Sequence, residues 1–320
     1  STGTSREHAT LCSGREGTRR RFVTGRWAPS PTGEFHVGNL RTALLAWLFA
    51  RSRGAELLWR FEDLDGAVRE DFYNYQLRDF QRIGLNWDGE IFRQSERLHL
   101  YRDAIEDLKR QGLTYRCWCT RREIREAAVA PHAHLPEGAY SGKSRQLTAR
   151  ETSENERSGR NPAIRIVSES QLIKIDDRQL GSFEGSVDDF VLCRGDLTPS
   201  YNLAAVIDDA DMGVTEVVRG DDLLPTTPRQ IYLFDLLGLE PPSYAHVPLV
   251  LTHSGDRLAK RDGAVTLDDR LALGESELDV LNYLLSSLEL RNVGSLGELD
   301  QIARYFDPSA LPTSPWIFDL

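Results

Sequence analysis

One strand–turn–helix segment near the beginning of the chain constrains the fold more than any other feature. Residues 21–28 predict a strand, and Pro29, Pro31 and Gly33 form a turn that neither a strand nor a helix interior tolerates. Apolar side chains then recur at helical spacing, and Gly54 marks the expected end of that helix. The sequence therefore predicts a helix that begins just beyond the end of a strand.

Three polar or small residues, His36, Gly38 and Asn39, fall at the beginning of this predicted helix. Unpaired backbone N–H groups and the positive end of the helix dipole meet at such a point, and both favour an anion. We expect His36 and Asn39 to donate hydrogen bonds to phosphates, and Gly38 to let a nucleotide approach the backbone closely. The alternative is that His36 only caps the helix.

Strands and helices alternate over the first part of the chain. Residues 57–61 predict a strand, and apolar spacing over 72–80 predicts a helix that ends near Gly84. Another helix is predicted over 101–108 and closes at Gly112. This alternation predicts an α/β fold with a right-handed, mostly parallel sheet, which binds its ligands at the carboxyl ends of the strands.

Two stretches depart from this alternation. The first 20 residues are polar and rich in Gly and Ser, which is typical of a flexible leader. Residues 113–191 contain short strands and polar loops, as expected for an insertion between two halves of a core. Within the insertion, residues 151–161 are nearly devoid of hydrophobic side chains, and we expect them to be the least ordered.

The composition narrows the possible environments. A chain of 320 residues with 40% hydrophobic content can bury a sizeable core. The net charge of −10 gives no general support to nucleic-acid binding, so any RNA site would be a local basic patch. No apolar run reaches the ~18–20 residues of a membrane span. The four cysteines are scattered and fit a reducing compartment. We expect a cytoplasmic protein with no membrane partner.

Four sequence blocks together resemble class I aminoacyl-tRNA synthetases of the glutamyl and glutaminyl type. Residues 29–39 are similar to the family's HIGH signature, 60–65 to its Arg-x-Glu-Asp-x-Asp strand, and 214–223 to a later strand–loop element. Residues 257–261 fall where the mobile KMSKS loop belongs. Because no large anticodon-binding region follows, the chain resembles most the short paralogues, the glutamyl-queuosine tRNA(Asp) synthetases.

This resemblance implies an activity and its partners. Glutamate would be activated by ATP to glutamyl-adenylate and then esterified to the queuosine base at the wobble position of tRNA(Asp). The implied partners are L-glutamate, ATP and the tRNA(Asp) anticodon stem-loop, and Mg²⁺ would bridge the phosphates. Two alternatives stay open, a truncated glutamyl-tRNA synthetase that charges the 3′ end of tRNA(Glu) and a catalytically silent paralogue that binds glutamate or RNA.

The resemblance also implies an organisation of the chain around a Rossmann-like core. Its parts are a flexible leader (1–20), the first half of the catalytic core (21–112), an insertion with a zinc-binding-like and acceptor-type subdomain (113–191), the second half of the core (192–250), and a KMSKS-type loop with a helical tail and no anticodon-binding domain (251–320).

Glutamate carries two carboxylates and an ammonium, so a specific pocket should offer two cations and one anion. By resemblance, Arg26 and Arg219 bind the carboxylates and Glu62 binds the ammonium. The complete implied glutamate set is Arg26, Ser30, Glu62, Tyr201, Asn202 and Arg219.

The implied catalytic residues are His36, Asn39 and Lys260, of which Lys260 would neutralise the departing pyrophosphate from a flexible loop. Arg257 and Ala259 replace the first lysine and the serine of the family's KMSKS motif. The implied ATP-binding set is Pro29, Gly33, His36, Gly38, Asn39, Leu251, Arg257 and Lys260.

Many members of the family carry a zinc site in a Cys-x-Cys and Tyr-x-x-x-Cys pattern. The matching positions here are Cys117, Cys119, Tyr140 and Ser144. A serine hydroxyl is a poor zinc ligand, so the resemblance leaves Zn²⁺ binding open. His132 or His134 in the same insertion could take the fourth position, and unliganded thiols are the alternative.

Overall fold

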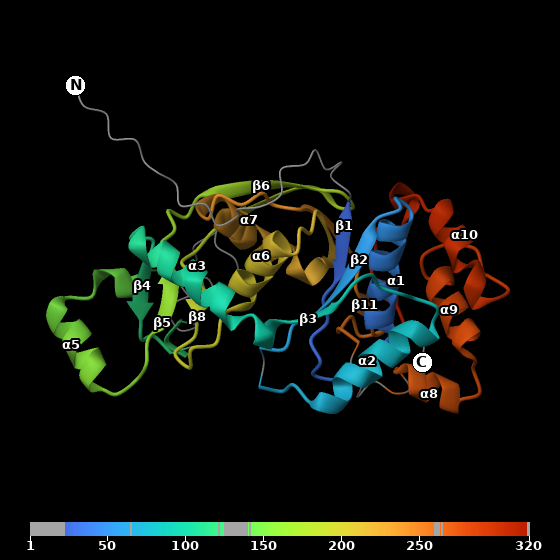
Figure 1. The fold of residues 1–320 in the computed structure, drawn as a ribbon, viewed down its shortest axis with the longest axis horizontal. Helices are drawn as coiled ribbons and strands as arrows, with labels where there is room; N and C mark the ends of the chain where they lie inside the picture. Colours follow the sequence, from blue (N-terminus) through green and yellow to red (C-terminus); the bar gives the residue numbers. More distant parts are fainter. Residues whose placement is uncertain are drawn as a thin grey trace, which may run out of the picture.

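The computed structural model describes residues 23–64, 66–120, 122–124, 140, 142–258, 263 and 265–318. The predicted leader lies outside this part of the chain. A parallel sheet in the order β10-β9-β1-β2-β3 forms the core (Figure 1). Its strands are β1 (Thr24–Trp27), β2 (Glu56–Phe61), β3 (Ile91–Arg93), β9 (Glu216–Gly220) and β10 (Ser243–Val247).

The order of this sheet contains a reversal that positions ligand-binding loops. From β1 the chain proceeds outward to β2 and β3, and it returns later to pair β9 with the other side of β1. A crevice forms where the order reverses, just beyond the carboxyl ends of the strands. The prediction of a parallel α/β fold is confirmed.

The core contains helices from both halves of the chain, and the first three of them begin and end close to their predicted limits. They are α1 (Val37–Arg51), α2 (Glu70–Arg82), α3 (Leu98–Arg110), α6 (Tyr201–Asp211) and α7 (Thr227–Leu236). Gly54, Gly84 and Gly112 follow the first three helices with φ of 62°, 86° and 74°. Glycine adopts this left-handed conformation without a steric penalty, which is why it ends helices.

Helix α1 lies between the parallel sheet and the carboxyl-terminal helices. It contacts β1 and β9 on one side and two helices of the carboxyl-terminal part on the other (Figure 1). That part consists of β11 (Val250–Leu251), α8 (Leu267–Ala272), α9 (Glu277–Ser286), α10 (Leu299–Arg304) and β12 (Trp316–Ile317). Because both of its sides are covered, α1 is apolar almost all round.

The segment between the two halves of the sheet forms its own small elements. They are β4 (Thr114–Cys117), β5 (Ala163–Ile166), β6 (Leu172–Asp177), β7 (Gly181–Ser186), β8 (Val191–Cys193) and the helix α5 (Ala149–Arg157). Strands β4, β5 and β8 make an antiparallel sheet, and β6 and β7 make a hairpin. The hairpin returns to the core, where it contacts α7 and β10.

The expectation that residues 151–161 are the least ordered is wrong, since α5 occupies much of this stretch. Thr148 and Glu151 form a capping box at its beginning, and Arg150 pairs with Glu154 one turn apart. No residue of α5 is buried. The shortage of apolar side chains therefore reflects a helix without a buried face, which its local capping box indicates.

Short 3₁₀ helices complete the described structure. They are η1 (Gln94–Glu96), η2 (Lys143–Gln146), η3 (Asp221–Thr226), η5 (Leu296–Glu298) and η6 (Pro308–Ala310). In the described part of the chain, every helix is too short or too polar to cross a membrane.

Candidate active site

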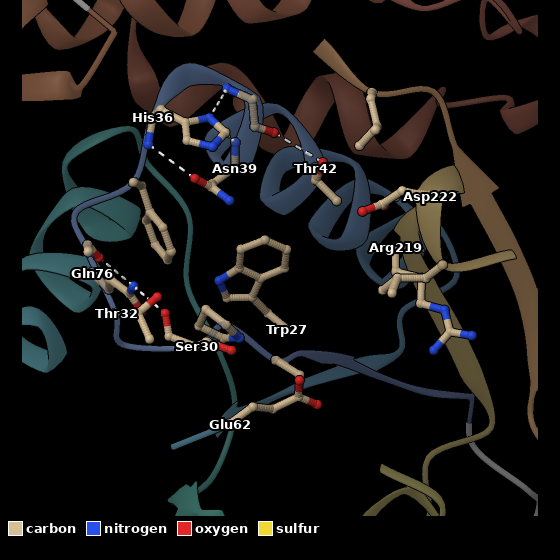
Figure 2. A pocket seen from close by; sticks show the side chains of 18 of the residues that line it. Trp27, Ser30, Thr32, His36, Asn39, Thr42, Glu62, Gln76, Arg219 and Asp222 are labelled. Atoms are coloured by element: carbon tan, nitrogen blue, oxygen red, sulfur yellow. Dashed lines mark hydrogen bonds between the residues drawn. The ribbon is translucent and has the colours of Figure 1, made fainter. Parts of the chain in front are cut away.

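A cavity of about 590 Å³ opens at the reversal of the sheet, beyond the ends of β1, β2 and β9 (Figure 2). Most of the predicted site residues line it, namely Arg26, Pro29, Ser30, Gly33, His36, Gly38, Asn39, Glu62, Tyr201, Arg219 and Arg257. Two predicted residues, Asn202 and Leu251, do not line it. Lys260 lies outside the described residues, as does its neighbour Ala259.

The turn after β1 is fixed by a residue that the sequence analysis missed. The buried Gln76 of α2 donates from Nε2 to the backbone oxygens of Ser30 (3.0 Å) and Gly33 (2.7 Å). The backbone N–H of Glu62 donates to the oxygen of Pro29 at 2.9 Å. A glutamine within a helical pattern carries no local sign of this role, because the partner turn lies 43 or more residues away.

His36 caps α1, as the alternative interpretation proposed. Its Nδ1 accepts from the backbone N–H groups of Gly38 (3.1 Å) and Asn39 (3.3 Å), and the Asn39 Oδ1 accepts from the backbone of His36 (3.1 Å). A neutral imidazole has one acceptor nitrogen and one donor nitrogen. Because Nδ1 accepts, the proton of neutral His36 is on Nε2, which is the form that can donate to a phosphate oxygen.

The expectation of unpaired backbone N–H groups at this helix is wrong. The first backbone donor, on Val37, bonds to the oxygen of Val265 at 2.8 Å, and His36 accepts from the next two. These hydrogen bonds therefore occupy the backbone N–H groups that could otherwise bind an anion. Side-chain donors, the His36 Nε2 and the Asn39 amide, are the groups suited to bind phosphate.

Gly38 is needed for the helix cap itself, in addition to its predicted role beside a nucleotide. A Cβ at this position would lie 2.9 Å from both Cε1 and Nδ1 of His36, and 3.3 Å from Cβ of Val250. Glycine therefore makes room for the His36 ring to fold back over the beginning of the helix.

Figure 2 shows Glu62 and Arg219 across the pocket from His36 and Asn39. Arg26 and Arg219 are 4% and 5% exposed, so both guanidinium groups are buried at this end. Two buried cations and one carboxylate are the charges that a glutamate pocket requires.

Glu62 belongs to a buried network of charges. Its Oε1 accepts from Nη2 of Arg60 at 3.2 Å, and Arg60 also pairs with Asp209 (2.7 Å) and Asp208 (3.6 Å). Burial raises the pKa of Glu62 above its ordinary value, although Arg60 and Arg26 lower it. An ammonium group bound here would stabilise the ionised carboxylate.

Arg219 is held in one orientation by three side chains. Its Nη1 donates to the Tyr201 hydroxyl at 3.1 Å, its Nη2 to Oγ1 of Thr227 at 2.8 Å, and its Nε to Nε2 of His246 at 3.1 Å. Within the described part of the chain these bonds use three of the five guanidinium N–H groups. The remaining two are available to a substrate carboxylate. The sequence analysis missed Thr227 and His246.

The rim of the pocket carries an exposed ion pair. Nη1 of Arg257 lies 2.7 Å from Oδ2 of Asp222, which follows β9. Arg257 also forms a β-bridge with Leu251, so the segment that leads to Lys260 is attached to β11. Arg257 thus lines the rim of the pocket, and its predicted role in ATP binding stays a prediction.

A second cavity of about 520 Å³ adjoins the first. The two cavities share Ser30, Glu62 and Tyr201. Arg194, from the loop after β8, also lines the second one. The second cavity therefore lies between the core and the insertion and reaches the glutamate end of the first.

The predicted zinc positions converge, but their chemistry does not suit zinc. Tyr140 donates to Oγ of Ser144 at 2.8 Å, and that hydroxyl lies 3.3 Å from Sγ of Cys117 and 3.5 Å from Sγ of Cys119. The family's pattern supplies three cysteines and a tyrosine, whereas this cluster offers two thiols and a serine hydroxyl, which is a poor zinc ligand. No group of three or more His, Cys, Asp or Glu that could hold a metal occurs among the described residues.

The histidines that could complete a zinc site, His132 and His134, lie outside the described residues. Among the described residues, hydrogen bonds join Cys117, Cys119, Tyr140 and Ser144 into one cluster.

The reversal in the parallel sheet and the histidine-capped helix at its edge define a Rossmann-like enzyme that binds a nucleotide. A family model for the catalytic domain of class I tRNA synthetases (E and Q) matches residues 22–320. The chain belongs to this family. It is therefore a ligase, and ATP is one of its substrates.

Individual proteins agree with this assignment. The chain is 53% identical to a glutamyl-Q tRNA(Asp) synthetase of Nocardia farcinica, over 92% of each chain. It is 46% identical to one of Cutibacterium acnes, over 87% of this chain and 80% of that one. A crystal structure of a glutamate tRNA ligase from Elizabethkingia meningosepticum, in complex with its amino acid, matches with a TM-score of 0.77 and 26% identity. That match covers 93% of this chain and 67% of the other.

Proposed function

We propose that this chain activates L-glutamate with ATP and transfers the glutamyl group to the queuosine base at the wobble position of tRNA(Asp). The observation that carries the first step is the pocket, in which the buried Arg26 and Arg219 and the largely covered Glu62 face the His36 turn. The transfer step is supported by relatives named glutamyl-Q tRNA(Asp) synthetase, which the chain matches over most of their length.

In the activation step, a carboxylate oxygen of glutamate attacks the α-phosphorus of ATP. The bond from that phosphorus to the bridging oxygen breaks, and pyrophosphate leaves with the electron pair. Arg26, Arg219 and Glu62 hold the amino acid, while Nε2 of His36 and the Asn39 amide donate to the phosphates. We assign Lys260 to the departing pyrophosphate by its place in the motif.

In the proposed reaction, Mg²⁺ would bind together with ATP, on its phosphates. The described residues contain no metal-binding group of three His, Cys, Asp or Glu side chains, so they do not form a cage for Mg²⁺. Mg²⁺ prefers phosphate oxygens and water to dedicated protein cages. We therefore assign no step to a protein-bound metal.

In the transfer step, a hydroxyl of the acceptor nucleoside attacks the acyl carbon of the adenylate, an ester forms, and AMP leaves. The second cavity suits the acceptor, because it meets the glutamate end of the first at Glu62 and Tyr201. Arg194 in its wall is a cation suited to the RNA backbone.

ATP–pyrophosphate exchange tests the activation step. We expect exchange with glutamate and not with aspartate or glutamine, and without added tRNA. Exchange that requires tRNA(Glu) would favour the glutamyl-tRNA synthetase alternative, and no exchange under any condition would favour the silent paralogue. Labelled glutamate should then attach to tRNA(Asp) that contains queuosine, and not to the same tRNA with guanosine at that position.

A further inference from the structure

A buried acid–imidazole pair stands behind Arg219, on the side away from the pocket. Nδ1 of His246 lies 2.6 Å from Oδ2 of Asp177, and Nε2 of the same ring lies 3.1 Å from Nε of Arg219. Both the Asp177 and the His246 side chains are fully buried. The three residues therefore form a chain of hydrogen bonds that ends at the proposed glutamate pocket.

The chemistry of the outer members fixes the proton on the imidazole. Arginine only donates, so Nε2 of His246 must be the acceptor, and a carboxylate only accepts, so Nδ1 must carry the proton. The ring is thus the neutral tautomer with hydrogen on Nδ1. Burial lowers the pKa of His246, the Asp177 bond raises it and the nearby Arg219 charge lowers it, with a net decrease that favours the neutral ring.

Asp177 reaches this position from the insertion. It is the last residue of β6, and it also accepts from the backbone N–H groups of Gln179 and Leu180 at 3.0 Å each. The next residue, Arg178, donates its backbone N–H to the oxygen of Tyr244 at 2.9 Å. The tip of the hairpin is therefore attached to β10, and Figure 1 shows β6 running past α7 towards the core.

We propose that Asp177 and His246 are positioning residues that orient Arg219 for the glutamate carboxylate. The inference rests on the proposed function, because it assumes that Arg219 binds glutamate. By setting the tautomer of His246, Asp177 keeps an acceptor directed at Nε of Arg219, so the remaining N–H groups of the guanidinium point at the substrate. A residue of the insertion would thus determine affinity for the amino acid.

The decisive variant is Asp177→Asn. Its Oδ1 can still accept from the backbone N–H groups of Gln179, Leu180 and His246, so the turn at the hairpin tip and its bond to β10 are retained. Its NH₂ group would donate to Nδ1 of His246 and move the ring proton to Nε2. That proton would then face the N–H donor of Arg219 at 3.1 Å, with Oγ1 of Thr227 at 3.2 Å as its other partner, so Arg219 would lose its acceptor. We expect the glutamate KM in ATP–pyrophosphate exchange to rise about tenfold or more, as when a hydrogen bond to a charged group is lost, and the ATP KM to stay unchanged.

A second variant, His246→Gln, tests whether Asp177 acts through the His246 ring or only stabilises the fold. In His246→Gln, the side-chain oxygen can still accept from Arg219, but no imidazole tautomer exists. Adding Asp177→Asn to this background should raise the glutamate KM far less than it does in the wild type, which makes the two changes non-additive. Asp88→Asn is the matched control, because Asp88 pairs with Arg51 away from the pocket and its loss should leave the glutamate KM unchanged.

The position of the ring proton on His246 can be measured directly, without an activity assay. Long-range ¹H–¹⁵N spectra of ¹⁵N-histidine-labelled protein should show hydrogen on Nδ1 of His246 in the wild type and on Nε2 in Asp177→Asn. An unchanged glutamate KM in Asp177→Asn, or equal rises of the glutamate and ATP KM with a lower melting temperature, would overturn the inference.

Calorimetric titration with glutamate separates this inference from the proposed function. If the wild type binds glutamate without exchange, the proposed function fails, and the ratio of Kd values between Asp177→Asn and wild type still tests the inference. If the wild type binds no glutamate, both are overturned.

Discussion

Replacing Glu62 by glutamine separates binding of the substrate from stability of the fold. The side chain is 12% exposed and its Oε1 accepts from Nη2 of Arg60. Glu62→Gln keeps the shape and removes the charge that we assign to the ammonium of glutamate. Because Arg60 retains Asp208 and Asp209 as partners, the buried guanidinium is not left unpaired.

The size of the effect follows from the interaction that is lost. A hydrogen bond to a charged group contributes about 1.5–3 kcal/mol, and about 1.4 kcal/mol corresponds to a factor of ten. We therefore expect the glutamate KM of Glu62→Gln to rise roughly ten- to a hundredfold, with the ATP KM unchanged. ATP–pyrophosphate exchange at varied glutamate concentration measures this, and Glu56→Gln, at the exposed beginning of the strand that precedes Glu62, is the control.

The thermal stability of Glu62→Gln should stay the same or rise, although its affinity for glutamate falls. The pKa of Glu62 is raised in the folded chain, mainly by burial, so this group contributes stability below its unfolded pKa and loses it as pH rises through its folded pKa. At neutral pH, Glu62→Gln should thus unfold at the same or a higher temperature than the wild type. A lower melting temperature together with an unchanged glutamate KM would refute this reasoning.

Four further outcomes are expected. In the wild type, the glutamate KM should rise as pH falls through the raised pKa of Glu62, because the protonated carboxyl no longer attracts an ammonium; a pH profile of exchange checks this. His36→Asn should keep the helix cap, since asparagine is a good N-cap, but lose the Nε2 donor, so exchange should fall steeply at an unchanged melting temperature. Gln76→Ala should lower the free energy of unfolding by about 1–3 kcal/mol in urea titration, because two backbone oxygens lose their donor. Ser144→Cys should bind zinc by mass-spectrometric metal analysis whereas the wild type does not; equal zinc in both would contradict our interpretation of the cluster.

Much of the fold is encoded in local sequence. The turn at Pro29 and Pro31, the helix stops at Gly54 and Gly84, and the alternation of strands and helices are all visible within windows of a few residues. They could be predicted because proline and glycine restrict or widen the backbone angles of their own residue, whatever packs around it. The motif blocks likewise indicated the family, since the spacing of residues around the His36 turn is itself local.

The pairing of hydrogen-bond donors with acceptors was decided only by the tertiary structure. The sequence placed His36 at the beginning of a helix, but which of its nitrogens caps that helix depends on how the ring folds over Gly38. Asp177 and His246 are 69 residues apart, and no local pattern connects them. Such pairs form when separately encoded elements pack and bury their polar groups, and each buried group must then find a partner in space rather than in sequence.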